Sequence, residues 1–174
     1  KGPLHYLSNI AAAVECLVRL GFSAQEVESK IQMLPQLPFR QSMYCRGSMI
    51  VINDSKSTNV QATIAAYSAT RYQHPKQKIL LVLAGVSKVQ AHAEIRDCVA
   101  SDSACDVVVV GESFQDLDDI LLARYRCIED LKIGIVKPYG VILFSPAGSS
   151  HDRYKDFTAR GIAFDQHIKT LWSG

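Results

Sequence analysis

The sequence predicts an α/β protein, with a Rossmann-like, doubly wound and mostly parallel sheet flanked by helices and two leading helices. Three observations predict it. Strand-length and helix-length segments alternate from about residue 48 onward. The segments 79–83, 107–110 and 141–144 are apolar at every position, as in a parallel sheet covered on both faces. Before residue 39, apolar residues recur at steps of three and four, the spacing of one helix face.

The first part, about residues 4–38, is expected to form two helices. An apolar stripe over 4–20 predicts the first helix, and Gly21 ends it because glycine accepts the left-handed backbone that follows a helix. Ser23 with Glu26 forms a capping-box pattern that starts the second helix. Two prolines end that helix, and residues 35–40 are expected to form an extended connector that leads to the sheet.

The second part, about residues 43–174, carries the sheet. Strands are expected at 43–46, 48–53, 78–85, 106–111, 126–128 and 140–145, and helices at 59–72, 91–100, 114–125 and 156–171. Between 126 and 139, Gly134 and Pro138 predict that any helix is stunted. We therefore expect one domain over 1–174, made of a helical lead-in that packs on an α/β sheet.

Composition excludes several classes of protein. The 174 residues carry a net charge of +2, too small for a nucleic-acid footprint or a polybasic membrane patch. No apolar run approaches the ~18 residues of a membrane span. The 5 cysteines are scattered without a C-x-x-C pair, so we expect neither disulfides nor a metal site. The chain opens on Lys1 rather than Met, which we interpret as a piece of a longer protein.

Short polar loops follow each apolar strand. In a sheet of this class ligands bind beyond the carboxyl ends of the strands. The loops at 54–59 and 84–88 each hold a lysine, Lys56 and Lys88, and helices start directly after them. Lysines together with helix N-termini favour a carboxylate or a phosphate. The alternative is a set of ordinary loops in which Ser, Asp and Asn only cap helices. Neither a G-x-G-x-x-G fingerprint nor a P-loop is present, so the chain cannot cradle a triphosphate in the usual way by itself.

The order of these motifs resembles the C-terminal, amino-acid-binding domain of the ATP-dependent Mur ligases over essentially the whole chain. The stretch Asp54-Ser55-Lys56-Ser57-Thr58-Asn59 is similar to the D-S-K-A-T-N motif of the branch that uses D-glutamate. The run at 145–152, followed by Phe157 and Arg160-Gly161, resembles the S-P-A-x-A-S-x-D-x-F-x-x-F-x-x-R-G pattern of that branch.

The resemblance implies a role for each of eight residues. Lys56 would be the catalytic residue that steadies negative charge at the reaction centre. The others would bind the substrate amino acid (Thr58, Lys88, Ser150 and Phe157) or the nucleotide (Asn9, Arg40 and Asp54). Simpler explanations exist for some side chains: the lysines could be solvated surface groups and Phe157 core packing. Arg160 could equally be a salt bridge, a cap or a ligand contact.

The resemblance also implies a reaction. The full enzyme would use ATP and Mg to add D-glutamate to UDP-N-acetylmuramoyl-L-alanine through an acyl phosphate, in peptidoglycan synthesis in the bacterial cytoplasm. A central domain would hold most of the ATP and metal, so this part alone is expected to be inactive. The partners would be its own central and N-terminal domains, with no nucleic acid and no membrane.

Two alternatives stay open: another Mur-type amide ligase with a different amino acid, or a non-catalytic α/β binding module. Tyr6, Phe39 and Ala84 depart from the family pattern, which has Asn, His and Gly there. These departures bear on nucleotide affinity, whereas the amino-acid side matches the family.

Overall fold

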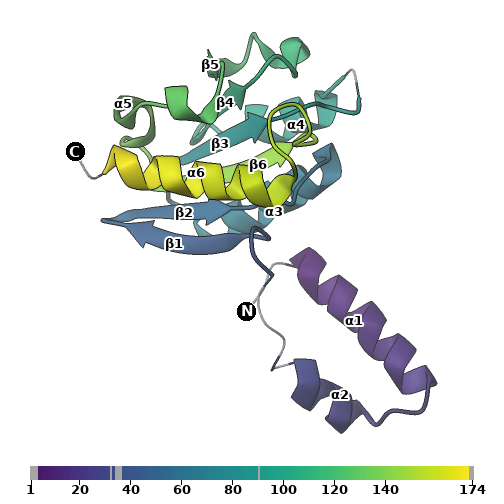
Figure 1. Ribbon diagram of the computed structural model, residues 1–174. Helices are drawn as coiled ribbons and strands as arrows, with labels where there is room; N and C mark the ends of the chain where they lie inside the picture. Colours follow the sequence, from purple (N-terminus) through teal and green to yellow (C-terminus); the bar gives the residue numbers. More distant parts are fainter. Residues whose placement is uncertain (1–3, 32, 34–36, 90, 173–174) are drawn as a thin grey trace. The chain divides into compact units, whose positions relative to one another are not determined.

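A computed structural model describes residues 4–31, 33, 37–89 and 91–172. The chain divides into two compact units, Lys1–Leu37 and Pro38–Gly174, and each is described by itself. The first unit contains α1 (Leu4–Arg19) and α2 (Ala24–Ile31), so both leading helices are confirmed (Figure 1).

The end of α1 follows from its glycine. Gly21 has φ +97°, and its N–H donates to the Val18 carbonyl oxygen at 3.0 Å. The N–H of Phe22 donates to the Leu17 carbonyl oxygen at 3.2 Å, which completes the Schellman arrangement that glycine permits.

The start of α2 follows from its capping box. The Glu26 N–H donates to Ser23 Oγ at 3.2 Å, and the Ser23 N–H donates to Glu26 Oε2 at 3.0 Å. The predicted helix residue Leu34 and the stop at Pro35 lie outside the described residues. The expected extended connector is wrong over the described residues Pro38 and Phe39, which form a turn in which Phe39 has φ +57°.

The second unit is built on a six-stranded sheet with the order β1-β2-β6-β3-β4-β5. β1 pairs antiparallel with β2 and every other neighbouring pair is parallel, which confirms the mostly parallel sheet. The strands are β1 (Ser42–Arg46), β2 (Met49–Asn53), β3 (Ile79–Ala84), β4 (Cys105–Val110), β5 (Leu121–Tyr125) and β6 (Val141–Ala147).

Helices cover both faces of the sheet (Figure 1). On one face, Phe144 stacks on Phe164 of α6 with ring centroids 4.1 Å apart. On the other face, Leu143 belongs to the cluster that contains Tyr67 of α3. Successive strand residues therefore enter opposite cores, which is why the segments 79–83, 107–110 and 141–144 are apolar at every position. The helices are α3 (Val60–Gln73), α4 (Ala93–Ala100), α5 (Ile133–Val136) and α6 (Phe157–Leu171), with the 3₁₀ turns η1 (Gln115–Leu117) and η2 (Ile128–Asp130).

Two predicted elements are wrong. Residues 114–125 do not form a helix: they form η1 and then β5, which adds to the edge of the sheet beside β4. The strand expected at 126–128 is not formed, and η2 begins there. Phe114 and Leu117 have the spacing of a helix, which is a local preference. At Leu121–Tyr125, backbone pairing with β4 outweighs this preference, and the segment forms a strand. The stunted helix between 126 and 139 is confirmed as α5, of 4 residues.

Candidate functional site

Arg160 joins two of the loops at the carboxyl edge of the sheet. Its side chain has 0% exposure. Nη1 donates to the Gly148 carbonyl oxygen at 2.9 Å, Nη2 to the Ser55 carbonyl oxygen at 2.9 Å, and Nε to Ser55 Oγ at 3.1 Å. Burial lowers the pKa of Arg160 to about 10. The guanidinium therefore acts as a buried cross-link between the loops after β2 and β6, a role that the sequence did not predict.

The loops after β3 and β6 are joined backbone to backbone. Val86 and Ser149 exchange hydrogen bonds at 2.9 Å and 2.8 Å. A Cβ on Gly85, which has φ +85°, would lie 2.1 Å from the Ser149 carbonyl oxygen. A Cβ on Gly148 would lie 2.7 Å from the Ala84 carbonyl oxygen. Both glycines are required by this close approach, and the three loops form one connected platform.

Asp54, the first residue after β2, is buried with 3% exposure. Oδ1 accepts the Gln41 N–H at 3.1 Å, and Oδ2 accepts the hydroxyls of Ser57 and, at 3.3 Å, of Ser145. Burial raises the pKa of Asp54 to about 6, although the Arg40 charge and these hydrogen bonds oppose the rise. Arg40 Nε is buried and has no hydrogen-bond partner among the described residues. Two predicted nucleotide residues, Arg40 and Asp54, are thus electrostatic neighbours.

Lys56 lies over the ring of Phe157, with Nζ 4.1 Å from the ring centroid. The Lys56 N–H donates to the Phe39 carbonyl oxygen at 2.9 Å. The Phe39 ring lies against Gly161 of α6, where a Cβ would be 2.3 Å from the ring. Phe157 is half-buried, so it serves both as packing and as the surface on which the lysine rests.

Lys88 opens onto a cavity of about 250 Å³ at the start of α3. Asn59 caps this helix by accepting the Ala62 N–H at 2.9 Å, and helix N-termini of this kind attract anions. Among the residues that the structure describes, neither Lys88 nor Lys56 has an ion-pair partner. The cavity is lined by Asn59, Val60, Gln61, Ser87, Lys88, Val89, Ala91, Glu94 and Ala147.

The remaining predicted residues are less closely joined. Thr58 is half-buried and directly precedes Asn59 at the cavity. Ser150 is buried with 3% exposure, and its carbonyl oxygen accepts the Tyr154 N–H at 2.9 Å. Asn9 is exposed on α1, in the other unit. The structure therefore brings Lys56 to Phe157, Arg40 to Asp54, and Lys88 to the N-terminus of α3.

Sequence reasoning missed the residues that hold these groups in place, namely Ser55 and Ser145. Ser55 Oγ donates to the Phe157 carbonyl oxygen at 2.8 Å, and the Ser145 carbonyl oxygen accepts the Thr63 hydroxyl at 3.1 Å. Both serines have 0% exposure. Their position at the ends of apolar strands was the available signal, because a buried hydroxyl requires partners.

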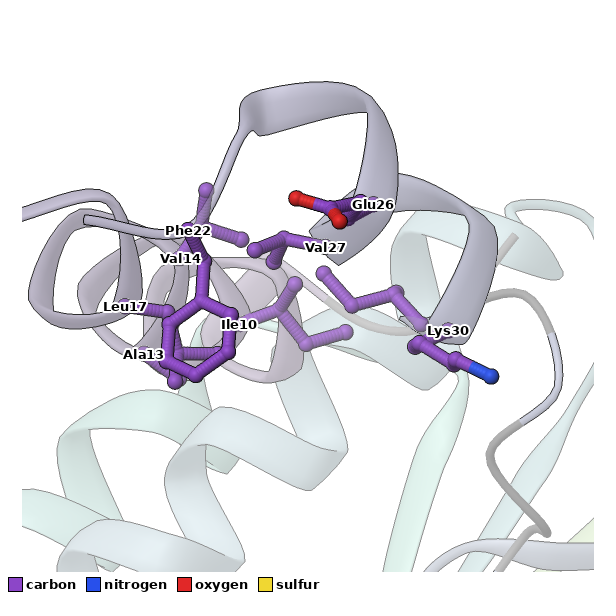
Figure 2. A pocket seen from close by; sticks show the side chains of 9 residues that line it. Ile10, Ala13, Val14, Leu17, Phe22, Glu26, Val27 and Lys30 are labelled. Carbon is purple, nitrogen blue, oxygen red and sulfur yellow. The ribbon is translucent and has the colours of Figure 1, made fainter. Parts of the chain in front are cut away.

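A separate groove lies in the first unit, between α1 and α2 (Figure 2). Its walls are apolar side chains such as Ile10, Val14 and Phe22, and Glu26 and Lys30 are its charged lining residues. An apolar lining of this kind does not suit a dicarboxylate ligand. In the part of the chain that the structure describes, no cluster of three His, Cys, Asp or Glu side chains could hold a metal ion, and no helix is long and apolar enough to cross a membrane.

Known proteins resemble this chain in sequence and in fold. No family model matches the chain. The chain is 30% identical over 175 residues to the UDP-N-acetylmuramoylalanine–D-glutamate ligase of Hydrogenobaculum sp. (strain Y04AAS1). The aligned region covers 95% of this chain and 41% of that protein. The enzyme of the same name from Nitrosococcus oceani is 30% identical over 178 residues, covering 97% of this chain and 38% of that protein.

The chain belongs to the Mur ligase family. It corresponds to the C-terminal domain of these ligases. It spans about two fifths of the length of the curated relatives that it matches, such as 41% of the Hydrogenobaculum enzyme. Among solved structures, the UDP-N-acetylmuramoylalanyl-D-glutamyl-2,6-diaminopimelate–D-alanyl-D-alanyl ligase from Acinetobacter baumannii matches with a TM-score of 0.70 and 19% identity, over 98% of this chain and 37% of that one.

A second structure, the UDP-N-acetylmuramate-alanine ligase of Thermotoga maritima, matches with a TM-score of 0.67 and 17% identity, over 98% of this chain and 39% of that one. At these identities the two structures support the fold alone. They confirm the Rossmann-like α/β class of the Mur ligase C-terminal domain.

Proposed function

We propose that this chain is the amino-acid-binding and nucleotide-contacting part of a three-domain, ATP-dependent ligase that adds D-glutamate to UDP-N-acetylmuramoyl-L-alanine in the bacterial cytoplasm. One observation carries the proposal. The Asp54–Asn59 motif, which resembles the branch of the family that uses D-glutamate, lies at the carboxyl end of β2 beside the loops that hold Lys88 and Ser150. The relatives named above carry that activity in their names.

The amino acid would be held by charge. D-glutamate has two carboxylates, and the ammonium of Lys88 at the N-terminus of α3, which has no ion-pair partner among the described residues, suits one of them. Thr58 adds a hydroxyl beside that helix end. Ser150, with the backbone near Phe157, would hold the second carboxylate. Glu94, which also lines the cavity, would repel a misplaced carboxylate and so favour one orientation of the substrate.

Lys56 is assigned to the reaction centre. In an acyl-phosphate ligase the amine nitrogen forms the new amide bond, the carbon–oxygen bond to phosphate breaks, and phosphate leaves while the nitrogen loses a proton. Negative charge is concentrated on the leaving phosphate, and a fixed cation stabilises it. The stacking of Lys56 on Phe157 holds its ammonium in place without neutralising it.

The nucleotide side rests on Arg40 and Asp54. Arg40 Nε, buried without a partner among the described residues, is a donor available to the nucleotide. For Asn9, a nucleotide contact is proposed from the family resemblance alone. The triphosphate and Mg would be bound mainly by the central domain. ATP supplies the phosphoryl group that activates the substrate carboxylate. This chain on its own is therefore expected to be inactive.

The test is ATP-dependent phosphate release by the full-length ligase, with UDP-N-acetylmuramoyl-L-alanine and a panel of amino acids. Release with D-glutamate alone is expected. Release with another amino acid would support the ligase activity and refute D-glutamate as the substrate. If a folded full-length protein releases no phosphate with any amino acid, the non-catalytic binding module becomes the better description.

A further inference from the structure

Three side chains, those of Ser87, His92 and Asp116, form a linear hydrogen-bond network that the proposed site does not use. Ser87 Oγ lies 2.6 Å from His92 Nε2, and His92 Nδ1 lies 2.6 Å from Asp116 Oδ1. Asp116 Oδ2 also accepts the His92 backbone N–H at 2.6 Å. The three residues come from the loop after β3, the N-terminal end of α4, and η1. Ser87 directly precedes Lys88.

The segment that carries Asp116 is fixed to the sheet by hydrogen bonds. Arg124 of β5 donates from Nη1 to the carbonyl oxygens of Gly111 at 2.8 Å and Ser113 at 2.7 Å, so it fixes the segment that leads into η1. The ring of Phe114 in the same segment lies 4.6 Å from the His92 ring. Asp116 is therefore held on a rigid support rather than on a free loop.

The serine end fixes the backbone around Lys88. Ser87 Oγ donates to the Val89 carbonyl oxygen at 2.9 Å and accepts the Val89 N–H at 3.2 Å. The Ser87 N–H donates to Ser113 Oγ at 3.3 Å. The hydroxyl thus holds the residues on both sides of Lys88, while the Lys88 side chain itself stays exposed at the cavity.

The order Ser–His–Asp resembles the hydrogen-bond order of a hydrolase triad, but the surroundings do not fit a nucleophile. His92 has 2% exposure and its ring is covered by Phe114, whereas the Asp116 side chain is 34% exposed. In a triad the acid is buried and the imidazole faces the substrate. The Ser87 hydroxyl, moreover, is already bonded to the Val89 backbone.

The hydrogen bonds from the His92 ring to Ser87 and to Asp116 can form whether the imidazole is neutral or charged. Asp116 accepts the Nδ1 proton in either state. A neutral ring accepts the Ser87 hydroxyl proton at Nε2, and the hydroxyl then holds Val89 by accepting its N–H. A protonated ring donates to Ser87 Oγ, which donates its own proton to the Val89 carbonyl oxygen. A positioning function suits such a link better than a proton-transfer function.

We propose that His92 and Asp116 are positioning residues, which fix the Ser87–Val89 backbone and thereby place the Lys88 ammonium for the carboxylate of the substrate amino acid. This rests on the proposed function of Lys88. Asp116 is the informative position because, among the residues that the structure describes, its carboxylate is hydrogen-bonded to His92 and not to Ser87, Lys88 or Val89.

The test uses Asp116→Ala and Asp116→Asn in the full-length ligase, with Asp97→Ala on the exposed face of α4 as the matched control. Asp116→Ala is expected to raise KM for D-glutamate about tenfold, since the buried His92 nitrogen loses its partner. KM for ATP should stay within about twofold. Asp116→Asn keeps an acceptor oxygen and should recover most of the loss.

Hydrogen exchange of the Val89 amide supplies a readout that does not depend on the reaction. It should be about tenfold faster in Asp116→Ala than in the wild type, and unchanged in Asp97→Ala. If Asp116→Ala matches Asp97→Ala in both readouts, the positioning role is overturned. If the wild-type ligase shows no turnover with D-glutamate, the proposed substrate fails, and the exchange rates still decide whether Asp116 fixes the loop.

Discussion

Arg160 holds Ser55 by two hydrogen bonds, from Nε to Oγ at 3.1 Å and from Nη2 to the carbonyl oxygen at 2.9 Å. Ser55 is the second residue of the motif that carries Lys56 and Thr58. Because the arginine has 0% exposure and comes from α6, the geometry of the motif is set from the core of the domain rather than from solvent. A guanidinium can make these bonds at once because its donors are fixed in a planar fork.

Replacement of Arg160 by lysine should therefore be costly although the charge is kept. An ammonium cannot reach Ser55 and Gly148 with the same geometry, and buried acceptors are left without donors. We expect Arg160→Lys to lower the free energy of unfolding by about 2–4 kcal/mol. Arg153→Lys, at an exposed position in the loop before α6, is the matched control and should be neutral. Denaturant unfolding of both variants measures the difference, and equal midpoints would refute the cross-link.

A methyl group at Gly85 should disrupt the platform. It would lie 2.1 Å from the Ser149 carbonyl oxygen, and the backbone has φ +85°, which an L-side chain adopts only with strain. We expect Gly85→Ala to destabilise the domain by at least about 3 kcal/mol, or to prevent folding. Gly134→Ala is the control, because nothing lies within 4 Å of its Cβ position. That variant should be neutral or slightly stabilising in the same thermal melt. Equal melting temperatures for the two would contradict the close approach.

Asp54 should make stability depend on pH. Its pKa is about 6 in the folded chain against 3.8 ordinarily, because burial penalises the carboxylate. The folded state thus keeps a proton that the unfolded chain releases in this interval. The resulting stabilisation is complete below about pH 4 and is lost as the pH rises through 6. Its full size is on the order of 3 kcal/mol, at about 1.4 kcal/mol per pH unit.

Asp54→Asn removes this titration and can still pair with Gln41, Ser57 and Ser145 through its amide. As the pH rises from 4 to 7, the wild type therefore loses stability relative to Asp54→Asn, so the free energy of unfolding of the variant minus that of the wild type should increase. Asp97→Asn, at an exposed carboxylate, shows whether the loss of any acid has the same effect. Denaturant unfolding at pH 4.5, 5.5 and 7 decides the matter. A constant difference between Asp54→Asn and wild type across this range would contradict the burial effect.

The central strands could be predicted because the segments 79–83, 107–110 and 141–144 are both short and wholly apolar, so composition and length agree. The prediction failed at β5, where Leu121–Tyr125 pairs with β4 at the edge of the sheet and contains no fully buried residue. Phe114 and Leu117 in front of it have the spacing of a helix, and no local signal shows that the backbone of β4 lies beside the following residues. Edge pairing is a tertiary event.

The candidate site divides in the same way. Lys56 and Lys88 could be found because charged residues directly after apolar strands are conspicuous. Arg160, His92 and Asp116 could not be assigned, since their partners lie far away in the sequence: Arg160 bonds Ser55 across 105 positions, and Asp116 bonds His92 across 24. Spacing along the chain carries no information about such contacts. The supporting groups of a site are therefore visible only in the fold.

Lys88 itself provides the most direct test of the proposed ligand. In the full-length ligase, Lys88→Ala removes the ammonium beside the α3 N-terminus and should raise KM for D-glutamate about 10–100-fold. KM for ATP should change far less, because the nucleotide residues Arg40 and Asp54 belong to a separate cluster. Lys76→Ala is the control: this exposed lysine lies before β3, at the opposite edge of the sheet.

The two Michaelis constants separate the possible outcomes. A selective rise in KM for the amino acid assigns Lys88 to carboxylate binding, because a cation that contacts only the amino acid cannot alter nucleotide binding to the same extent. An equal rise for D-glutamate and ATP would place Lys88 at a site common to both and would contradict the assignment. Steady-state phosphate release, with each substrate varied in turn at saturating concentrations of the others, yields both constants from one preparation.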